Sequence, residues 1–458
     1  NYGDWIAMAI HEGELMKYNP GTNQLVKIDI PEANHTFVRN VACFDNELWV
    51  GTHEGLFVVN ERKNKIVHLK QDLMRPFSLS DKIIYTIYRD REGGIWLGTM
   101  FGGVDYLPHH DLLFDKYVPG SDGNSLTTKR VREIASDNKG NIWIGTEDDG
   151  VNILNIASGK VRRLRLNDYD KGNYMVTLGM FVKGSQLFCG LFKQGLDVIQ
   201  LPENKVCHYT PEELNIGEGS VYTFFIDNEG YKWIGTGWGL YKAAPTSFHF
   251  DKVEEVGFDW IFDVFQDKDG MMWFASMGSG LWKYDPHKNL FKKYTHEEGK
   301  ENTLSSNSVS SVMQDCKGRI WISTDRGGIC CYNSQTDDFT TFSIKDGLPD
   351  DVAYKILEDE QSNLWFGTNR GLVRFNPESK DIRVYTTKDG LLGNQFNYKS
   401  ALKGEDGKFY FGGIDGLIAF DPNSSEKINF LPPVYISKFS IYNQEITVHT
   451  PNLSLIHI

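Results

Sequence analysis

The stretch that decides the fold is Asp137-Asn-Lys-Gly-Asn-Ile-Trp-Ile-Gly-Thr146, which is followed by Glu-Asp-Asp-Gly150. Residues 137–140 supply the polar side chains and the glycine of a tight turn. Ile142, Trp143 and Ile144 favour a strand. The next four residues turn the chain again, so the stretch predicts one arm of a β-hairpin between two turns.

The same arm returns along the chain at a regular spacing. Close copies contain Trp96, Trp233, Trp273, Trp321 and Trp365, and weaker copies contain Trp49, Phe188, Tyr410 and, in degenerate form, Trp5. The spacing is roughly 45 residues, which is the period of a four-stranded β-propeller blade. Repetition at this period predicts an all-β fold of stacked blades with almost no helix.

Each repeat unit is expected to contain four strands. In the unit of Trp321 these are residues 308–313, 319–324, 328–332 and 338–342, separated by Asp, Asn and Gly turns. A single blade buries too little surface to be stable, so blades must stack around an axis. The glycine after the tryptophan lets the next sheet approach closely. The residues interpreted as wedges between blades are Trp49, Trp96, Trp143, Trp233, Trp273, Trp321 and Trp365.

Ten units exceed the four to eight blades of an ordinary ring. We therefore expect a seven-bladed propeller over residues 111–428, from the Trp143 unit to the Tyr410 unit. Residues 1–110 would be the last three blades of another propeller, incomplete because the chain starts inside a repeat. Residues 429–458, with Pro432-Pro433 and two alternating strands, would begin a third, truncated module.

Composition excludes several classes of function. The formal net charge of −13 argues against a nucleic-acid partner or an anionic membrane surface, because both require basic patches. No apolar run is long enough to span a bilayer. The cysteines show no metal-ligand spacing and are interpreted as core thiols rather than as a disulfide framework. They are Cys43, Cys189, Cys207, Cys316, Cys330 and Cys331.

We expect no catalytic residues, no metal and no cofactor in this chain. The repeat aspartate occurs in nearly every unit, whereas a catalytic carboxylate is needed once, so it is interpreted as a turn staple. His109, His110 and His208 lack partners at metal-ligand spacing and are interpreted as loop residues.

Ligand-binding candidates are the residues that depart from the repeat in loops on one face. In a propeller, the loop between the second and third strands of a unit and the loop between units open on the same side. Aromatic rings there can stack on sugars, and charged groups can hydrogen-bond to them. The candidates are Trp238, Trp260, Phe192, Lys193, Arg326, Arg370, Asp415 and Phe101.

Trp238 is the leading candidate because it stands between two glycines with little core to fill. The alternative is that it packs on a neighbouring loop, and Trp260 is an equal companion. Phe101 belongs to the first group of blades, so a place at the junction between propellers is its alternative.

The repeat Asp-x-x-Gly-x-Ile-Trp-x-Gly-Thr-x-x-Gly-Gly resembles the two-component regulator propeller repeats of hybrid two-component sensors from Bacteroides-type gut bacteria. Residues 394–402 and 410–422 are similar to the last blade of that family, and Pro432-Pro433-Val resembles the start of its immunoglobulin-like Y_Y_Y domain. Departures from the pattern are Ser362 for Gly, Gly404 for Asp, and Phe188 and Tyr410 for Trp.

The resemblance implies a periplasmic, homodimeric sensor of two seven-bladed propellers and a sandwich, attached to the inner membrane through a downstream segment and followed by a histidine kinase. It implies oligosaccharide ligands and control of polysaccharide-utilisation genes. No kinase residue lies within these 458 positions, so the chain itself is expected not to be an enzyme. Two alternatives stay open: a propeller lyase of the streptogramin-lyase type and a scaffold for protein–protein contacts.

Overall fold

The computed structural model describes residues 4–10, 14–30, 36–63, 65–73, 77–91, 93–108, 114–120, 124–164, 176–201, 203–217, 219–424, 440–441 and 444–445. Its elements are almost all β-strands, which confirms the all-β prediction. Most of the predicted third module lies outside these residues, except for the short pair β39 (Ser440–Ile441) and β40 (Gln444–Glu445). His109 and His110 also lie outside them.

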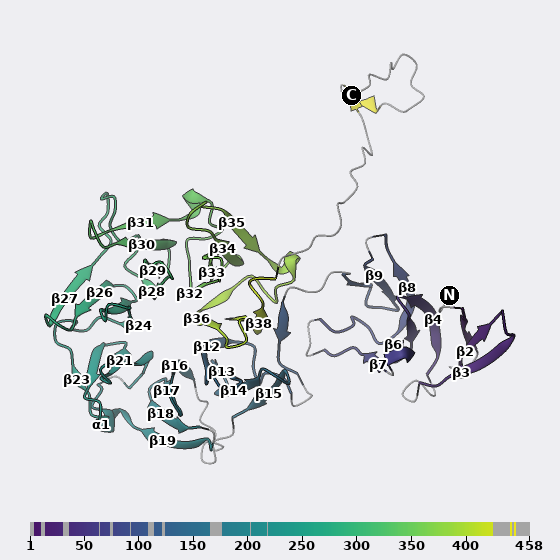
Figure 1. The fold of residues 1–458 in the computed structure, drawn as a ribbon, viewed down its shortest axis with the longest axis horizontal. Helices are drawn as coiled ribbons and strands as arrows, with labels where there is room; N and C mark the ends of the chain where they lie inside the picture. Colours follow the sequence, from purple (N-terminus) through teal and green to yellow (C-terminus); the bar gives the residue numbers. More distant parts are fainter. Residues whose placement is uncertain are drawn as a thin grey trace.

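The first group of strands forms small antiparallel sheets, drawn in purple and blue in Figure 1. Within the described residues, the middle sheet has four strands and its two neighbours have three each. Their strands are β1 (Ile6–Ile10), β2 (Glu14–Asn19) and β3 (Gln24–Ile28); β4 (Val38–Phe44), β5 (Glu47–Thr52), β6 (Gly55–Asn60) and β7 (Lys65–Leu69); and β8 (Ile84–Arg89), β9 (Ile95–Thr99) and β10 (Val104–Leu107).

The second group, within residues 114–424, forms a ring of sheets (Figure 1). The first three units contain β12 (Val131–Ser136), β13 (Asn141–Thr146), β14 (Val151–Asn155) and β15 (Lys160–Arg163); β16 (Thr177–Lys183), β17 (Gln186–Leu191), β18 (Gly195–Gln200) and β19 (Lys205–Tyr209); and β20 (Thr223–Ile226), β21 (Lys232–Thr236), β22 (Gly239–Ala243) and β23 (Asp251–Lys252).

The remaining units contain β24 (Ile261–Gln266), β25 (Met272–Ser276), β26 (Gly280–Asp285) and β27 (Leu290–Tyr294); β28 (Val309–Gln314), β29 (Ile320–Thr324), β30 (Ile329–Asn333) and β31 (Asp338–Phe342); β32 (Ile356–Glu358), β33 (Leu364–Gly367), β34 (Leu372–Phe375) and β35 (Ile382–Tyr385); and β36 (Phe396–Lys403), β37 (Phe409–Gly413), β38 (Leu417–Phe420) and β11 (Asp115–Tyr117).

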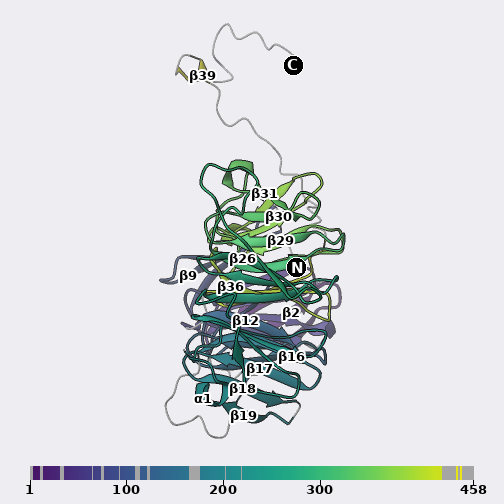
Figure 2. The same ribbon diagram turned by 90° about the vertical axis from the view of Figure 1, so that its left-hand side faces the viewer.

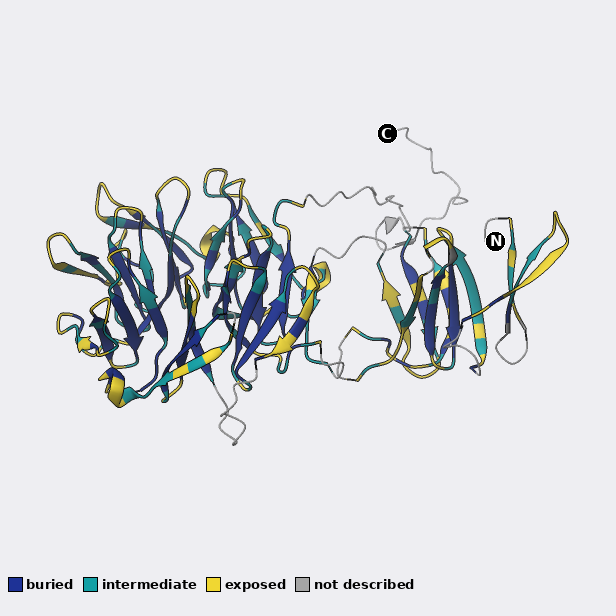
Figure 3. Ribbon diagram, turned by 60° about the horizontal axis from the view of Figure 1, so that its bottom comes forward, coloured by how far each residue is buried: buried dark blue, intermediate teal, exposed yellow. Residues whose placement is uncertain are grey.

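These seven units of four strands surround a common centre. Figures 1 and 2 place the units β16–β19 and β28–β31 on opposite sides of the ring. Buried residues line the strands, and exposed residues gather in loops and outer strands (Figure 3). The described α-helix is a single short turn, α1 (Pro211–Leu214), so helix is nearly absent, as predicted.

The ring closes through residues that are far apart in sequence. At the outer edge of the last unit, β11 pairs antiparallel with β38, with Lys116 opposite Ile418. At the inner edge, β12 pairs parallel with β36, with Glu133 opposite Lys399, and this joins the first and last units in one sheet. The repeat pattern did not reveal the role of β11, because this short strand carries none of the repeat residues.

The repeat aspartate is a turn staple, as predicted. Asp315 Oδ1 accepts hydrogen bonds from the backbone N–H groups of Lys317 (3.0 Å) and Arg319 (2.8 Å), and its Oδ2 accepts one from the indole N–H of Trp321 (2.9 Å). The carboxylate therefore ties the turn to the wedge tryptophan of the same unit. Equivalent indole bonds join Asp90 to Trp96, Asp137 to Trp143, Asp227 to Trp233, Asp267 to Trp273 and Asp359 to Trp365.

Stability at acid pH is expected to depend on this staple. Burial raises the pKa of the Asp315 carboxyl, but hydrogen bonds from Trp321 and Arg319 outweigh it and the net pKa lies below the ordinary 3.8. A carboxyl whose pKa is lowered on folding stabilises the fold above its unfolded pKa and loses that contribution as the pH falls further. The difference in melting temperature between the wild type and Asp315→Asn should therefore shrink from pH about 5 to about 3, as measured by calorimetry. A difference independent of pH would contradict this assignment.

Two departures from the repeat are compensated locally. Gly404 replaces the staple aspartate of the last unit, and there Asp406 accepts a hydrogen bond from the Tyr410 hydroxyl (2.9 Å). In the unit of Phe188, which has no polar hydrogen, Lys183 pairs directly with Gln186 across a two-residue turn. In these two units, an acceptor is therefore present for the tyrosine hydroxyl and absent beside the phenylalanine, which has nothing to donate.

The five repeat tryptophans of the ring, from Trp143 to Trp365, are nearly fully buried, as a wedge between units requires. Trp96 differs, because its side chain is 41% exposed and packs on Tyr106 of the same small sheet (ring centroids 4.5 Å apart). The close approach predicted at the following glycine is confirmed: a Cβ on Gly235 would lie 2.6 Å from the carbonyl oxygen of Ile261 in the next unit.

Candidate functional site

Trp238 lies in the loop between β21 and β22 and is displayed to solvent. Its side chain is 61% exposed. Its backbone N–H donates to Thr236 Oγ1 (3.1 Å), and the Thr236 hydroxyl donates to the carbonyl of Gly239 (3.1 Å). The Thr-Gly turn of the repeat thus presents the indole outward rather than into the core.

A neighbouring loop presents two more exposed aromatic rings. It connects β23 to β24 and carries Phe258 and Trp260. The two loops are in close contact at Gly239, where an added Cβ would lie only 2.7 Å from the carbonyl oxygen of Gly257. We call Trp238, Phe258 and Trp260 the rim patch.

The rim patch continues inward to aromatic rings at the centre of the ring. Trp260 packs edge-on against Tyr222 (5.0 Å between centroids), and Tyr222 lies 6.1 Å from Phe262. Phe262 packs edge-on against Tyr398 (5.5 Å), which packs edge-on against Tyr354 (5.0 Å). We call Tyr222, Phe262, Tyr354 and Tyr398 the axial aromatic cluster. Phe262 and Tyr398 come from non-adjacent units, so they meet across the centre of the ring.

Sequence reasoning missed the axial aromatic cluster, although a signal was present. Tyr222, Phe262 and Tyr354 each stand 11 residues before the repeat tryptophan of their unit. At Phe262 the pairing register shifts between Ile261 and Asp263, which is a β-bulge. A bulge re-aims a side chain out of the strand alternation. Aligning the units on their tryptophans would have shown aromatic residues recurring at this position.

A buried ion pair lies next to the axial aromatic cluster. Lys399 Nζ is 3.0 Å from Glu133 Oε2, and both side chains are nearly fully buried. Lys399 also donates to the carbonyl of Tyr222 (2.5 Å), and its ammonium lies 5.3 Å from the Phe262 ring centroid. Burial raises the pKa of the neighbouring Asp263, and the positive charges of Lys399 and Lys355 oppose but do not cancel this rise.

Polar groups from two loops that carry predicted ligand-binding residues border the axial aromatic cluster. The Tyr354 hydroxyl donates to Asn369 Oδ1 (2.7 Å). Asn369 precedes Arg370 in the loop between β33 and β34, so this loop lies beside the cluster. Burial, followed by the negative charge of Asp325, raises the pKa of Tyr398. The side chain of Arg326, next to Asp325, is 86% exposed. Phe262 and Tyr354 are buried and Tyr222 and Tyr398 are half-buried, so the axial aromatic cluster packs the centre of the ring beside these loops.

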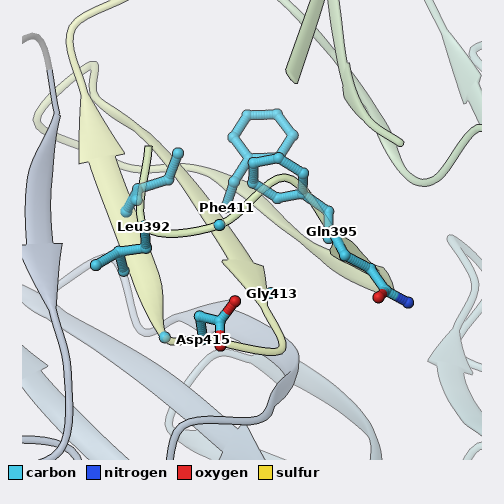
Figure 4. Close-up of a pocket in the computed structure, with 9 residues that line it drawn as sticks. Leu392, Gln395, Phe411, Gly413 and Asp415 are labelled. Atoms are coloured by element: carbon cyan, nitrogen blue, oxygen red, sulfur yellow. The ribbon is translucent and has the colours of Figure 1, made fainter. Parts of the chain in front are cut away.

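The other predicted residues lie in other loops, away from the rim patch. Phe192 is partly exposed in the loop between β17 and β18, with the Lys193 ammonium 5.2 Å from its ring centroid. Asp415 lines a small crevice with Leu392 and Gln395 in the last unit (Figure 4), and its Oδ1 is 3.8 Å from Lys129 Nζ. Phe101 is highly exposed in the β9–β10 loop, outside the ring.

Among the described residues, no group of three or more His, Cys, Asp or Glu side chains is arranged to hold a metal ion. The interpretation of His208 as a loop residue was wrong: it lies on the outer strand β19 opposite Asp197, and its Nδ1 is 2.7 Å from Asp197 Oδ1. The cysteines are free thiols, and Cys189 and Cys330 are buried as predicted. The core-thiol interpretation was wrong for Cys207 and Cys316, which are exposed because they lie on an outer strand and in a turn.

No helix within the described ranges has the length and hydropathy to cross a membrane.

Comparison with known proteins identifies the repeats. Residues 78–101, 125–148 and 347–370 match the family model described as "Two component regulator propeller". Histidine kinase P4 of Formosa agariphila is 26% identical to this chain, and the match covers 40% of this chain and 17% of that protein.

Solved structures show the same fold. The extracellular domain of the hybrid two component system BT3049 from B. thetaiotaomicron has a TM-score of 0.78 at 22% identity, covering 97% of this chain and 59% of that one. Virginiamycin B lyase from Staphylococcus aureus has a TM-score of 0.50 at 13% identity, covering 67% of this chain and 97% of that one. The chain therefore carries two-component regulator propeller repeats and has the fold of the extracellular domain of a hybrid two-component system.

Proposed function

We propose that this chain is the ligand-sensing, extracytoplasmic region of a hybrid sensor histidine kinase, and that it binds an oligosaccharide on the loop face of the ring. The observation that carries the proposal is an aromatic track formed by the exposed rim patch and the half-buried Tyr222, on which Trp260 packs. Exposed apolar patches on a soluble surface mark binding sites.

The chemistry of the track suits a sugar. The C–H-rich faces of pyranose rings pack on aromatic rings such as Trp238 and Trp260. Hydroxyl groups need planar hydrogen-bonding partners, which the site offers at Asn369, Arg326 and Arg370. The length of the track favours several linked sugars over a single one.

Signalling would follow from unequal affinity of the ligand for two arrangements of a homodimeric receptor. A ligand shifts such an equilibrium only by its differential affinity for the two states.

The parent protein would reside in the inner membrane with this region in the periplasm. The region would be divided into residues 1–110, 111–428 and 429–458, and the parent protein would control polysaccharide-utilisation genes. The chain itself would carry no catalytic step, and neither a lyase nor a scaffold role has a specific observation in its favour.

The proposal is tested by titrating the 458-residue chain with oligosaccharides of defined linkage. A ligand at 100 times its dissociation constant should add about 2.7 kcal/mol to the free energy of unfolding. For a ligand detected in this way, Trp238→Ala and Trp260→Ala should each weaken binding by roughly twofold to tenfold, because each removes an aromatic contact of about 0.5–1.5 kcal/mol. Isothermal titration calorimetry measures the change.

Leu290→Ala is the matched control, since Leu290 is exposed on the outer strand β27, away from the loop face. Its affinity should equal that of the wild type. No stabilisation by any glycan would favour the scaffold role. Binding unchanged in both tryptophan variants would place the ligand elsewhere.

A further inference from the structure

One position recurs in or just before the innermost strand of every unit of the ring. It stands 11 residues before the aromatic repeat residue, or 10 residues in the unit of Phe188. In five units the strand pairing shifts register across it, which marks a β-bulge that re-aims the side chain. Two cations occupy this position, whereas the other units place neutral side chains there. The seven residues are Arg132, Leu178, Tyr222, Phe262, Ser310, Tyr354 and Lys399.

Arg132 is accessible to solvent, whereas Lys399 is not. The Lys399 side chain is 5% exposed and is paired with Glu133, but the Arg132 side chain is 21% exposed. Glu133 lies opposite Lys399 in the parallel pairing of β12 and β36, so Arg132 lies beside Tyr398, the residue before Lys399. Tyr398 is itself half-buried. Arg132 therefore stands beside an aromatic residue that solvent can reach.

A second guanidinium group acts on Tyr398 from a different unit. Arg326 lies in the loop between β29 and β30, and its side chain is 86% exposed. Burial and the negative charge of Asp325 raise the pKa of the Tyr398 hydroxyl, and the positive charges of Arg132 and Arg326 oppose this rise. Such effects come from nearby charges. Two guanidinium groups from different units therefore lie near one tyrosine hydroxyl.

The carboxylates beside these arginines do not use all of their donors. Glu147 is shared, because its Oε1 lies 2.7 Å from Arg132 Nη1 and its Oε2 lies 3.6 Å from Arg130 Nη1. Arg326 Nε lies 3.9 Å from Asp325 Oδ2, which is too long for a hydrogen bond. Three guanidinium groups thus share two carboxylates, so these residues carry one excess positive charge on a chain whose net charge is −13.

The backbone of Arg326 is held in a conformation that favours glycine, with a φ of 75°. Most of the other non-glycine residues with positive φ in the described ranges are Asn or Asp, which tolerate this region. An arginine there is unfavourable, and residues held in such conformations cluster at ligand-binding sites.

The arginines lie close to the rim patch. The Phe262 ring centroid is 6.1 Å from that of Trp260 and 5.5 Å from that of Tyr398. Only one ring therefore separates the exposed Trp260 from the tyrosine beside Arg132 and Arg326. One oligosaccharide is long enough to contact both.

We propose that the oligosaccharide is acidic, and that Arg132 and Arg326 hold its carboxylate or sulfate group beside Tyr398 while a neighbouring sugar packs on Trp260. This inference rests on the proposed function, because it names the class of glycan for the same face of the ring. Guanidinium groups donate paired hydrogen bonds to such anions. One negative charge on the ligand balances the excess positive charge of the arginines.

The test compares glycans that differ in charge alone, by isothermal titration calorimetry on the 458-residue chain. For the carboxylate, β-1,4-linked oligoglucuronates are paired with cello-oligosaccharides of equal length, and oligogalacturonates with their methyl esters. For the sulfate, κ-carrageenan oligosaccharides are paired with their desulfated forms. In at least one pair, the charged member should bind about tenfold or more tightly than the uncharged member.

Two variants assign the effect to the arginines. Arg132→Gln and Arg326→Gln should each weaken binding of the charged member by about tenfold. Arg326→Gln should melt at the wild-type temperature, because the side chain is exposed. Arg162→Gln is the matched control, since Arg162 is exposed on the outer strand β15, and it should bind as the wild type does.

The possible failures are distinguishable. Equal affinity for charged and uncharged glycans would overturn the acidic ligand and leave the sensing role intact. Charged binding that is unchanged in both arginine variants would also overturn it. Binding of no glycan, charged or uncharged, would overturn both proposals.

Discussion

Replacing Lys399 by methionine is expected to lower the free energy of unfolding of the ring by about 3–5 kcal/mol. The substitution leaves the Glu133 carboxylate buried without its partner, which was 3.0 Å away, and it removes the bond to the Tyr222 carbonyl. The pair also bridges β12 and β36, where the first and last units meet. Destabilisation here therefore acts at the closure of the whole ring.

Chemical denaturation followed by tryptophan fluorescence measures the effect. Arg163→Met is the matched control, because Arg163 lies 2.6 Å from Asp149 in an exposed pair on the surface. That variant should lose less than about 1 kcal/mol. The double variant Glu133→Gln/Lys399→Met should recover much of the loss, since neither charge is then stranded. A loss for Lys399→Met as small as that of the control would show that water reaches Glu133.

Replacing Gly190 by alanine is expected to cost about 3 kcal/mol, at the upper end of the usual range for overpacking. The added Cβ would lie 2.3 Å from the carbonyl oxygen of Val221 and 2.8 Å from its Cγ1, both in the next unit. A backbone oxygen cannot rotate away as a side chain can, so the two sheets would have to separate. Thermal unfolding of Gly190→Ala against the wild type checks this.

Gly145→Ala tests the same repeat position with a softer neighbour. There the nearest atom is a methyl carbon of Thr177 at 3.0 Å, which can shift slightly. We expect a cost of about 1 kcal/mol. Ala275 and Ser323 occupy the equivalent position in two other units and are fully buried, so a small side chain fits where the next strand leaves room. Equal costs for both glycine variants would contradict the role of the backbone carbonyl.

The candidate site was only partly predictable. Trp238 and Trp260 stood out because each departs from the repeat in a loop, and the structure shows both exposed on neighbouring loops. Phe258 was missed because it lies in the same loop without a repeat-based signal. Tyr222, Phe262 and Tyr398 were missed because hydrophobic residues on inner strands are ordinarily core, and only a bulge and the geometry of the centre bring them together.

What the sequence by itself determined is the repeated local framework of each unit. The Asp315–Trp321 staple spans six residues, and the glycine and threonine turns are equally local, so their spacing predicts the blade and its period. The tertiary structure alone decided what depends on closing the ring: the pairing of Glu133 with Lys399, the insertion of β11 beside β38, and the meeting of Phe262 with Tyr398. Partners more than a hundred residues apart leave no mark on a local pattern, because their contact is created by the curvature that successive blades accumulate around the axis.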